Sequence, residues 1–387
     1  MDAGTTARHA TDAGISVDEL QLATRNNGMP LEALDWSLTP AGLHYLLIHY
    51  DIPRVDTATW SLRVDGRVRR SLTKSLAELR SRPARTLAVT MECAGNGRAR
   101  LEPRPVSQPW LVEAVGTAEW TGTPLRLLLD EAELLDDAVE IVFTGLDHGM
   151  EGGIEQDYAR SLSIEEASGD DVLLAYEMNR EPLLPQHGFP LRLVVPGWYG
   201  MTNVKWLRRI TAVAEPFTGF QQAEGYRLLR DRDDPGEPVK RMAPRALMVP
   251  PGFPDFMTRR RFVGPGACRV RGRAWSGLAP VTQVQLSADG ERTWHDASLD
   301  DADLGPYAWR GWSWTWEPSG TGDYELWCRA RDAAGNEQPV DADWNVKGYA
   351  NNAVQRVPVT VMAASRWASA ERGASYAPRD SNPEPAD

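Results

Sequence analysis

Residues 90–98, Thr-Met-Glu-Cys-Ala-Gly-Asn-Gly-Arg, are the stretch on which the interpretation of this sequence depends. They follow an apolar run typical of a β-strand, and they end in small residues and an arginine. This pattern places Cys93 at the end of a strand, where the backbone opens and the thiol can reach a bound group. Taken alone, a cysteine in such a loop is most often structural, and a catalytic nucleophile is the next hypothesis.

The chain around this loop, between residues 56 and 216, alternates strand-like and helix-like segments, which predicts an α+β domain. The expected strands are Trp60 to Val64, Thr86 to Met91, Glu140 to Phe143 and Leu191 to Val195. The expected helices lie near residues 124–134 and 163–168.

A change of composition follows this domain. Residues 227–254 are rich in Pro, Asp and Arg without periodicity, which indicates a linker. Strands spaced by turn signals come next, and they predict a β-sandwich: Cys268 to Trp275, Thr282 to Ala288, Trp309 to Glu317, Asp323 to Asp332 and Val354 to Met362. Trp312, Trp314 and Trp316 alternate with small residues, so all three indoles share one sheet face, either in the core or at a partner surface.

Length and charge limit the classes of protein. A chain of 387 residues predicts two domains and can bury a large cofactor. The net charge of −12 argues against a nucleic-acid partner and requires a local basic pocket for any anion. No stretch approaches the ~18 uninterrupted apolar residues of a membrane helix, so no membrane partner is expected.

The acidic first twenty residues lack the apolar core of an export signal, so we expect a cytoplasmic protein. Residues 1 to about 20 and 364–387 are small, polar and Pro-containing, which predicts loose ends. Three cysteines are too few for a disulfide framework, and Cys268 and Cys328 are interpreted as separate buried thiols.

From about Thr39 to Met362 the chain resembles the sulfite oxidase family of molybdopterin-dependent oxidoreductases, whose Cys-Ala-Gly-Asn signature matches residues 93–96. The resemblance implies an α+β protein. Its parts would be a sulfite-oxidase-type mixed α/β catalytic domain in residues 21–243, an immunoglobulin-like β-sandwich dimerisation domain in residues 244–364, and a disordered tail in residues 365–387.

The resemblance also implies a molybdenum-molybdopterin cofactor, with the Cys93 thiolate bound to the metal beside the dithiolene of the pterin. A soft thiolate suits this metal better than an oxygen ligand. Arg192 and Lys205 can form charge-assisted bonds with the phosphate of the pterin, and His187 can bond the edge of its heterocycle. The residues matched to cofactor binding are His49, Asp147, His187, Arg192, Asn203, Val204 and Lys205.

A sulfite dianion needs fixed cations and a hydroxyl group near the metal. The residues that the resemblance assigns to this pocket are Arg98, Trp110, Tyr226 and Arg356, the last from the sandwich. One position departs from the family, because the usual Arg-Asn-His is Leu47-Ile48-His49 here. Loss of one charge-assisted contact weakens anion binding by ~1.5 to 3 kcal/mol unless another cation compensates, and Arg25 is a candidate for that replacement.

The implied reaction is oxygen-atom transfer, with sulfite as the first substrate. The alternatives are another substrate of the same cofactor (nitrate, an S-oxide or a thiosulfate-like sulfur) and a non-catalytic β-sandwich scaffold. No Cys-x-x-Cys-His motif occurs, so no haem is expected, and the electrons would pass to an external cytochrome or to dioxygen. The resemblance implies a homodimer formed through the sandwich.

Overall fold

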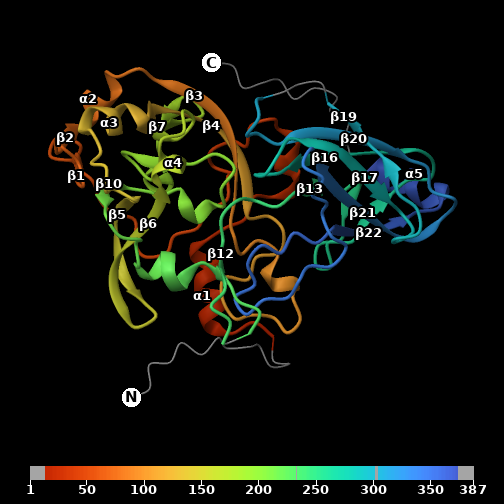
Figure 1. Ribbon diagram of the computed structural model, residues 1–387. Coiled ribbons are helices and arrows are strands. Elements are labelled where there is room, and N and C mark those ends of the chain that lie inside the picture. The colour runs from red at the N-terminus through yellow and green to blue at the C-terminus, as the bar shows by residue number, and fades with distance from the viewer. Residues whose placement is uncertain (1–13, 232, 301–303, 374–387) are drawn as a thin grey trace.

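A computed structural model describes residues 14–231, 233–300 and 304–373, which form two parts joined along one side (Figure 1). The first part carries α1 to α4 and the early strands, and the second is built from the strands of the C-terminal third. Within the described residues, no helix has the length and apolar character needed to cross a membrane.

The first part contains two sheets that enclose an apolar core. One has the order β2(Leu72–Ser75), β1(Ser61–Gly66), β10(Leu207–Val213), β5(Glu140–Glu151), β6(Ile154–Ser163), with β1 parallel to β10 and the other pairs antiparallel. The other has the order β3(Arg85–Glu92), β4(Val115–Pro124), β7(Leu173–Met178), β8(Glu181–Pro182), and β9(Arg192–Val194) pairs with β7. Leu62, Phe143 and Ile210 from the first sheet meet Leu174 and Leu193 from the second. These antiparallel strands and helices confirm a mixed α/β architecture.

Three of the four helices of this part begin with the same local signal. Ser16, Ser75 and Ser163 each accept a hydrogen bond from the backbone N–H three residues later, and a Glu at that position reaches back. The helices that start in this way are α1(Val17–Arg25), α2(Leu76–Arg80) and α4(Ile164–Ala167). The fourth, α3(Leu125–Ala132), turns its apolar stripe toward the core.

The second part is a two-sheet sandwich. One sheet has the order β13(Arg245–Met248), β16(Cys268–Trp275), β20(Arg310–Trp316), β19(Ser298–Leu299). The other has the order β14(Phe253–Pro254), β15(Arg261–Val263), β22(Gln355–Val361), β21(Gly322–Asp332), β17(Val281–Ser287), β18(His295–Asp296). Both sheets contribute to one apolar core, which includes Trp312 and Trp316 with Trp314 packed against it, so the three indoles do share the core face. Cys268 and Cys328 are free thiols; Cys328 is buried as predicted, whereas Cys268 is half-buried.

The predicted linker is only partly a linker. Residues 227–254 contain a small hairpin, β11(Arg227–Leu228) and β12(Glu237–Pro238), and then β13, which is a full member of the sandwich. Strand β13 lies on the side of the sandwich that faces the first part, where η1(Leu31–Asp35) packs on β13 and β16. The composition hid this strand because its flanks are rich in proline.

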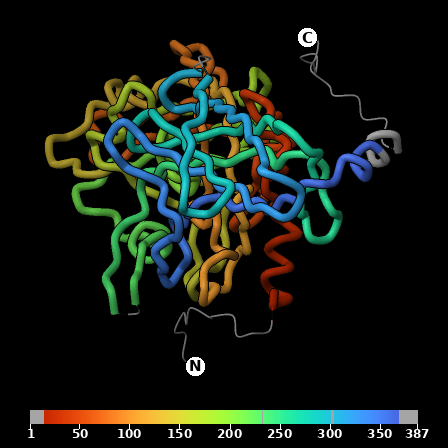
Figure 2. The backbone as a smooth tube through the Cα atoms, turned by 90° about the vertical axis from the view of Figure 1, so that its right-hand side faces the viewer, coloured from red at the N-terminus to blue at the C-terminus, as the bar shows by residue number. Residues whose placement is uncertain are grey.

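Both predicted loose ends contain a helix. Residue Glu19 of α1 is buried in an ion pair with Arg104, which fixes this helix to the body. Helix α5(Ala364–Gly373) projects from the sandwich in Figure 2, and Trp367 stacks on Phe253 with ring centroids 5.7 Å apart. The structure describes residues 365–373 as part of α5, and the disordered tail predicted for residues 365–387 stays a prediction. Residues 1–13 and 374–387 lie outside the described residues. The domain boundaries at 243 and 364 stay predictions.

Candidate active site

A cavity lies in the first part, beside the end of β3. Its walls are formed by residues 44–49, by the start of the loop after β3, and by the segment that includes η3(Pro185–His187), β9 and η4(Gly200–Thr202). The residues that line it and that the sequence singled out are Leu47, His49, Cys93, Asp147, His187, Arg192, Asn203, Lys205 and Tyr226.

Cys93 opens into this cavity directly after β3. Its backbone N–H donates to the carbonyl of Ala114 at 2.8 Å, which fixes the start of the loop. Burial raises the pKa of the thiol, and the positive charge of Arg98 acts against this shift. Trp110 packs against Cys93 in a small buried cluster. The thiol is therefore sheltered from water and accessible to a group bound in the cavity.

Two cations also line the cavity, the buried Arg192 and the half-buried Lys205. Lys205 Nζ donates to the carbonyl of Leu47 at 2.7 Å and to that of Gln186 at 3.3 Å. Arg192 donates to the carbonyls of His187 at 3.0 Å and Asn203 at 3.1 Å. Burial lowers the pKa of Lys205 to about 7 and that of Arg192 to about 10. Their bonds go to neutral carbonyls, so an anion in the cavity would be their natural counter-charge.

The remaining predicted cofactor contacts are also buried. Burial raises the pKa of Asp147 to about 6, and its Oδ1 has no hydrogen-bond partner among residues 14–231, 233–300 and 304–373. Burial lowers the pKa of His187 to about 3, so its imidazole is neutral near pH 7. Asn203 Oδ1 accepts from the backbone N–H of Val195 at 2.7 Å. Val204 packs in the core and does not line the cavity.

His49 and Tyr226 form a pair on the third side of the cavity. His49 Nε2 lies 2.6 Å from the hydroxyl oxygen of Tyr226, and the His49 ring packs on Tyr158 with centroids 4.8 Å apart. Burial lowers the pKa of His49 to about 3 and raises that of Tyr226 well above its usual range. Near pH 7 both groups are uncharged, so Tyr226 keeps its proton. Tyr349 of the sandwich part stacks on Tyr226 at 5.1 Å.

Comparisons with known proteins agree with this geometry. Residues 49–221 match the oxidoreductase molybdopterin binding domain, and residues 253–362 match the Mo-co oxidoreductase dimerisation domain. Sulfite oxidase from Gallus gallus is 38% identical over 337 residues, covering 82% of this chain and 72% of that protein. The chain belongs to the sulfite oxidase family. It is thus a molybdopterin-dependent oxidoreductase, and the hypothesis of a non-catalytic scaffold is wrong.

Other relatives within this family are more distant. Mitochondrial sulfite oxidase from Mus musculus is 33% identical, covering 84% of this chain but 62% of that protein. NADH nitrate reductase from Hordeum vulgare is 30% identical over 84% of this chain and 38% of that protein. The structure of the sulfane dehydrogenase SoxCD from Paracoccus pantotrophus matches with a TM-score of 0.76 and 25% identity, over 92% of this chain and 90% of that chain.

The site fits the cofactor of the sulfite oxidase family. No three His, Cys, Asp or Glu side chains gather to hold a metal in the part of the chain that the structure describes. A metal at Cys93 must therefore arrive with other ligands, as a pterin dithiolene would provide them. Arg192 and Lys205, whose hydrogen bonds go to neutral acceptors, suit a phosphate, and the Asp147 oxygen that lacks a hydrogen-bond partner among the described residues suits a ring N–H donor of the pterin.

Two of the arginines assigned to substrate binding are not at the cavity wall. Arg356 lies on β22, where it pairs with Asp341 at 2.7 Å and covers the Trp327 ring at 4.2 Å, which corrects its assignment to the pocket. Arg98 is buried behind the Cys93 loop, and its Nε donates to the carbonyl of Lys347 at 2.8 Å. Its charge reaches the thiol, but its side chain does not line the cavity.

Arg25 does not replace the missing family arginine. It is half-exposed, donates to the carbonyl of Tyr50 and pairs with Asp51 at 3.3 Å, outside the cavity. The sandwich cation beside the Tyr226 segment is instead Lys347, whose Nζ donates to the carbonyls of Glu224 and of Gly225. The resemblance assigned this role to Arg356, which lies nine positions further along the chain.

The cavity wall also contains residues that the sequence analysis missed. These are His44, Tyr45, Tyr158 and Met201. His44 is buried with its Nε2 unpartnered among the described residues, and burial lowers its pKa to about 4. It stands five residues before His49 in the same stretch, so the run of polar aromatic residues there was an available signal. Tyr158 gave none, because it lies in the middle of the amphipathic strand β6.

Proposed function

We propose that this enzyme oxidises sulfite to sulfate and passes the electrons to an external acceptor. The observation that carries the proposal is that Cys93, the cations Arg192 and Lys205, and Tyr226 all line one cavity. This set provides a soft metal ligand, a site for an anionic tail and a neutral hydrogen-bond donor.

When bound, the molybdenum cofactor supplies the oxygen-atom transfer. The protein would hold it through the Cys93 thiolate, with Arg192 and Lys205 on its phosphate and Asp147 and His187 on its heterocycle. The Cys93 thiol would lose its proton on becoming a metal ligand, which would offset the effect of burial on its pKa.

The chain's own contribution to the reaction is to orient the substrate and to exclude water. Tyr226 keeps its hydroxyl proton, and His49 fixes the direction of that hydroxyl at 2.6 Å. The positive charge of Arg98 stabilises negative charge near Cys93 from behind the loop. Aromatic rings surround these groups: Tyr158 packs against His49, Tyr349 against Tyr226, and Trp110 against Cys93. They lower the local dielectric constant, which strengthens the electrostatic interactions of the site.

A second candidate substrate is a thiosulfate-like or sulfane sulfur compound. Leu47 lines the cavity at the position where the family arginine is missing, so the site has one fixed cation fewer for a dianion. An apolar side chain favours a substrate with a larger, softer sulfur end. The fold match to a sulfane dehydrogenase over most of both chains supports this alternative. Nitrate and S-oxides remain alternative substrates of the same cofactor.

The test is a steady-state assay of purified, cofactor-loaded enzyme with an artificial electron carrier against sulfite, thiosulfate, a sulfane substrate and nitrate. We expect the highest kcat/KM with sulfite. A higher kcat/KM with a sulfane sulfur would replace the first proposal by the second. Repeating the assay with dioxygen, ferricyanide and a cytochrome identifies the acceptor, because a direct oxidase consumes oxygen without a mediator.

We also propose a cytoplasmic homodimer that forms through the sandwich, which we assign to the immunoglobulin-like class. The hairpin of β14 and β15 exposes Phe256 by 83% and Met257 by 81%, the largest exposures among its hydrophobic residues. Such a patch at the start of a dimerisation domain supports contact with a second copy. Light scattering should give twice the chain mass, and Phe256→Asp should weaken the dimer while Leu278→Asp, at another exposed site, should not.

A further inference from the structure

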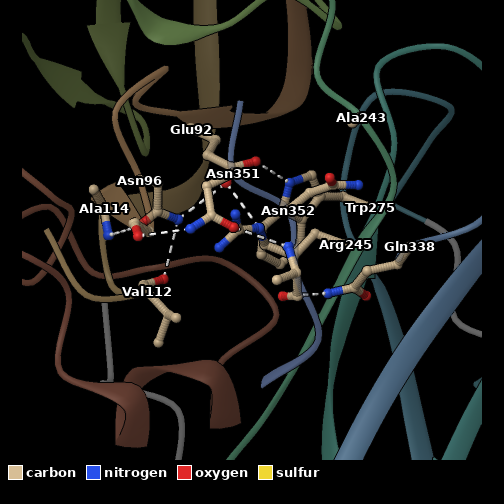
Figure 3. Close-up of polar contacts among 12 residues, drawn as sticks. Glu92, Asn96, Val112, Ala114, Ala243, Arg245, Trp275, Gln338, Asn351 and Asn352 are labelled. Carbon is tan, nitrogen blue, oxygen red and sulfur yellow. Dashed lines mark hydrogen bonds and ion pairs between the residues drawn. The ribbon is translucent and has the colours of Figure 1, made fainter. Parts of the chain in front are cut away.

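The residue before Cys93 is buried and charged. Glu92 ends β3 with 1% of its surface exposed, and its Oε1 lies 3.0 Å from Nε of Arg245, which is 2% exposed. Arg245 is the first residue of β13, so this ion pair joins the metal-binding loop to the sandwich. Figure 3 shows the pair between the two parts of the molecule.

The second carboxylate oxygen of Glu92 is also held by the sandwich. Trp275 Nε1 donates to Glu92 Oε2 at 2.9 Å, and Trp275 is the register partner of Arg245 across β13 and β16. Two neighbouring strands therefore present one cation and one N–H group to a single carboxylate (Figure 3).

Asn96 connects the same carboxylate to the backbone of the loop. Its Nδ2 donates to Glu92 Oε1 at 3.0 Å and to the carbonyl of Val112 at 3.1 Å, and its Oδ1 accepts from the N–H of Ala114 at 3.1 Å. Cys93 donates its own N–H to the Ala114 carbonyl, and the Asn96 N–H donates to the Cys93 carbonyl at 2.9 Å. Both peptide groups of Cys93 are thus fixed within this network.

The sandwich part also forms hydrogen bonds with the far end of the loop. The N–H of Ala350 donates to the Ala94 carbonyl at 2.8 Å, and Asn351 Nδ2 donates to the Gly97 carbonyl at 2.7 Å. Gly97 has φ +90°, and a Cβ there would come within 2.9 Å of the Asn351 carbonyl oxygen. The glycine is therefore required both for the turn and for this close approach.

A buried ion pair is an inefficient way to stabilise a fold, because desolvation offsets its Coulomb attraction. Its value lies in fixing one geometry. We propose that Glu92 and Arg245 are a positioning pair, through which the sandwich domain fixes the direction of the Cys93 thiol. The functional side of this statement rests on Cys93 being the metal ligand.

The first test uses the full chain without cofactor and measures the alkylation rate of each cysteine by iodoacetamide and peptide mass spectrometry. Arg245→Met should speed the alkylation of Cys93 by about tenfold or more, because the loop opens more often. The matched control is Arg271→Met, which removes another ion pair between the two parts, with Asp35 at 2.6 Å on the surface. That control should leave the rate at Cys93 within about twofold of wild type.

Cys328 reports on loosening of the sandwich core beside Arg245, because it is buried there with its Sγ 3.4 Å from the carbonyl oxygen of Ala246. If its alkylation rises in step with that of Cys93 in Arg245→Met, the pair has a merely structural role and the proposal is overturned. An unchanged rate at Cys93 overturns it too. The double variant Glu92→Gln with Arg245→Met leaves no unpaired buried charge, so it should recover thermal stability while the Cys93 rate stays high.

The second test uses the loaded enzyme and the electron paramagnetic resonance spectrum of its Mo(V) state. Arg245→Met should change the g-values and lower kcat with KM for sulfite unchanged, whereas Arg271→Met should match wild type. An Arg245→Met spectrum identical to wild type overturns the positioning role. Wild-type protein without molybdenum would instead refute the proposed function, and the alkylation test would still decide whether the pair positions Cys93.

Discussion

The cavity has two sides that follow the family to different degrees. On the cofactor side, Asp147, His187, Arg192 and Lys205 all line the wall as the resemblance implied. Of the residues assigned to substrate binding, Tyr226 lines the cavity, and Leu47 stands there in place of the family's arginine. The difference shows that cofactor binding and substrate choice are under separate control in this fold.

The physical reason is the number of partners that each side chain has. Arg192 and Lys205 are each held by two backbone carbonyls of neighbouring segments, so a change at either disturbs several elements. The Leu47 side chain packs against the cluster that contains Cys93, and the backbone carbonyl of Leu47 is the part that accepts a hydrogen bond from Lys205. A substitution at 47 can thus change the pocket without changing the bonds that hold it.

Cys93 stands between the two sides, and its substitution should have the largest effect. Cys93→Ser replaces the soft thiolate by a poor ligand for molybdenum, so sulfite oxidation should fall below detection while the thermal unfolding midpoint stays close to wild type. Steady-state assays and calorimetry measure these two results. The control is Cys268→Ser, which should keep full activity. Retained turnover in Cys93→Ser would refute the ligand assignment.

Lys205→Met tests the cofactor side alone. Loss of one charge-assisted contact should lower the affinity for the cofactor by about tenfold to a hundredfold, which appears as a lower molybdenum content of purified enzyme. The kcat per bound molybdenum should stay near wild type. Lys240→Met is the matched control, because Lys240 also lies over a tryptophan ring but pairs with Glu166 outside the cavity. A full metal content in Lys205→Met would contradict the phosphate assignment.

The sequence was most informative where chemistry depends on a short segment. Cys93 at a strand end and the strands that flank it were predicted from local pattern, and the structure places them so. Arg356 was placed wrongly because position along a β-strand does not show which side chain crosses between two parts of a fold. Lys347 reaches the Tyr226 segment through a loop whose path depends on the packing of both parts.

The network behind Cys93 was invisible in the sequence for the same reason. Glu92 and Arg245 are 153 positions apart, and each alone would be interpreted as a solvated charge. Their meeting depends on β13, the strand hidden inside the predicted linker. Long-range pairing of buried polar groups follows from tertiary packing, which local periodicity does not encode.

Leu47→Arg tests the substrate side, with the smallest expected effect. If the missing arginine is what weakens the site for a dianion, restoring it should lower KM for sulfite by about tenfold, the equivalent of ~1.4 kcal/mol, with kcat per molybdenum changed by less than about threefold. Leu47→Met, which keeps the apolar character and the volume, should leave KM unchanged. Leu47→Arg should raise KM for a sulfane-sulfur substrate, because Arg replaces an apolar contact for its soft sulfur end, and Leu47→Met should leave that KM unchanged. Should Leu47→Arg leave KM for sulfite unchanged, another cation already supplies the contact, and Lys347, which already lies beside the Tyr226 segment, is the group to change next.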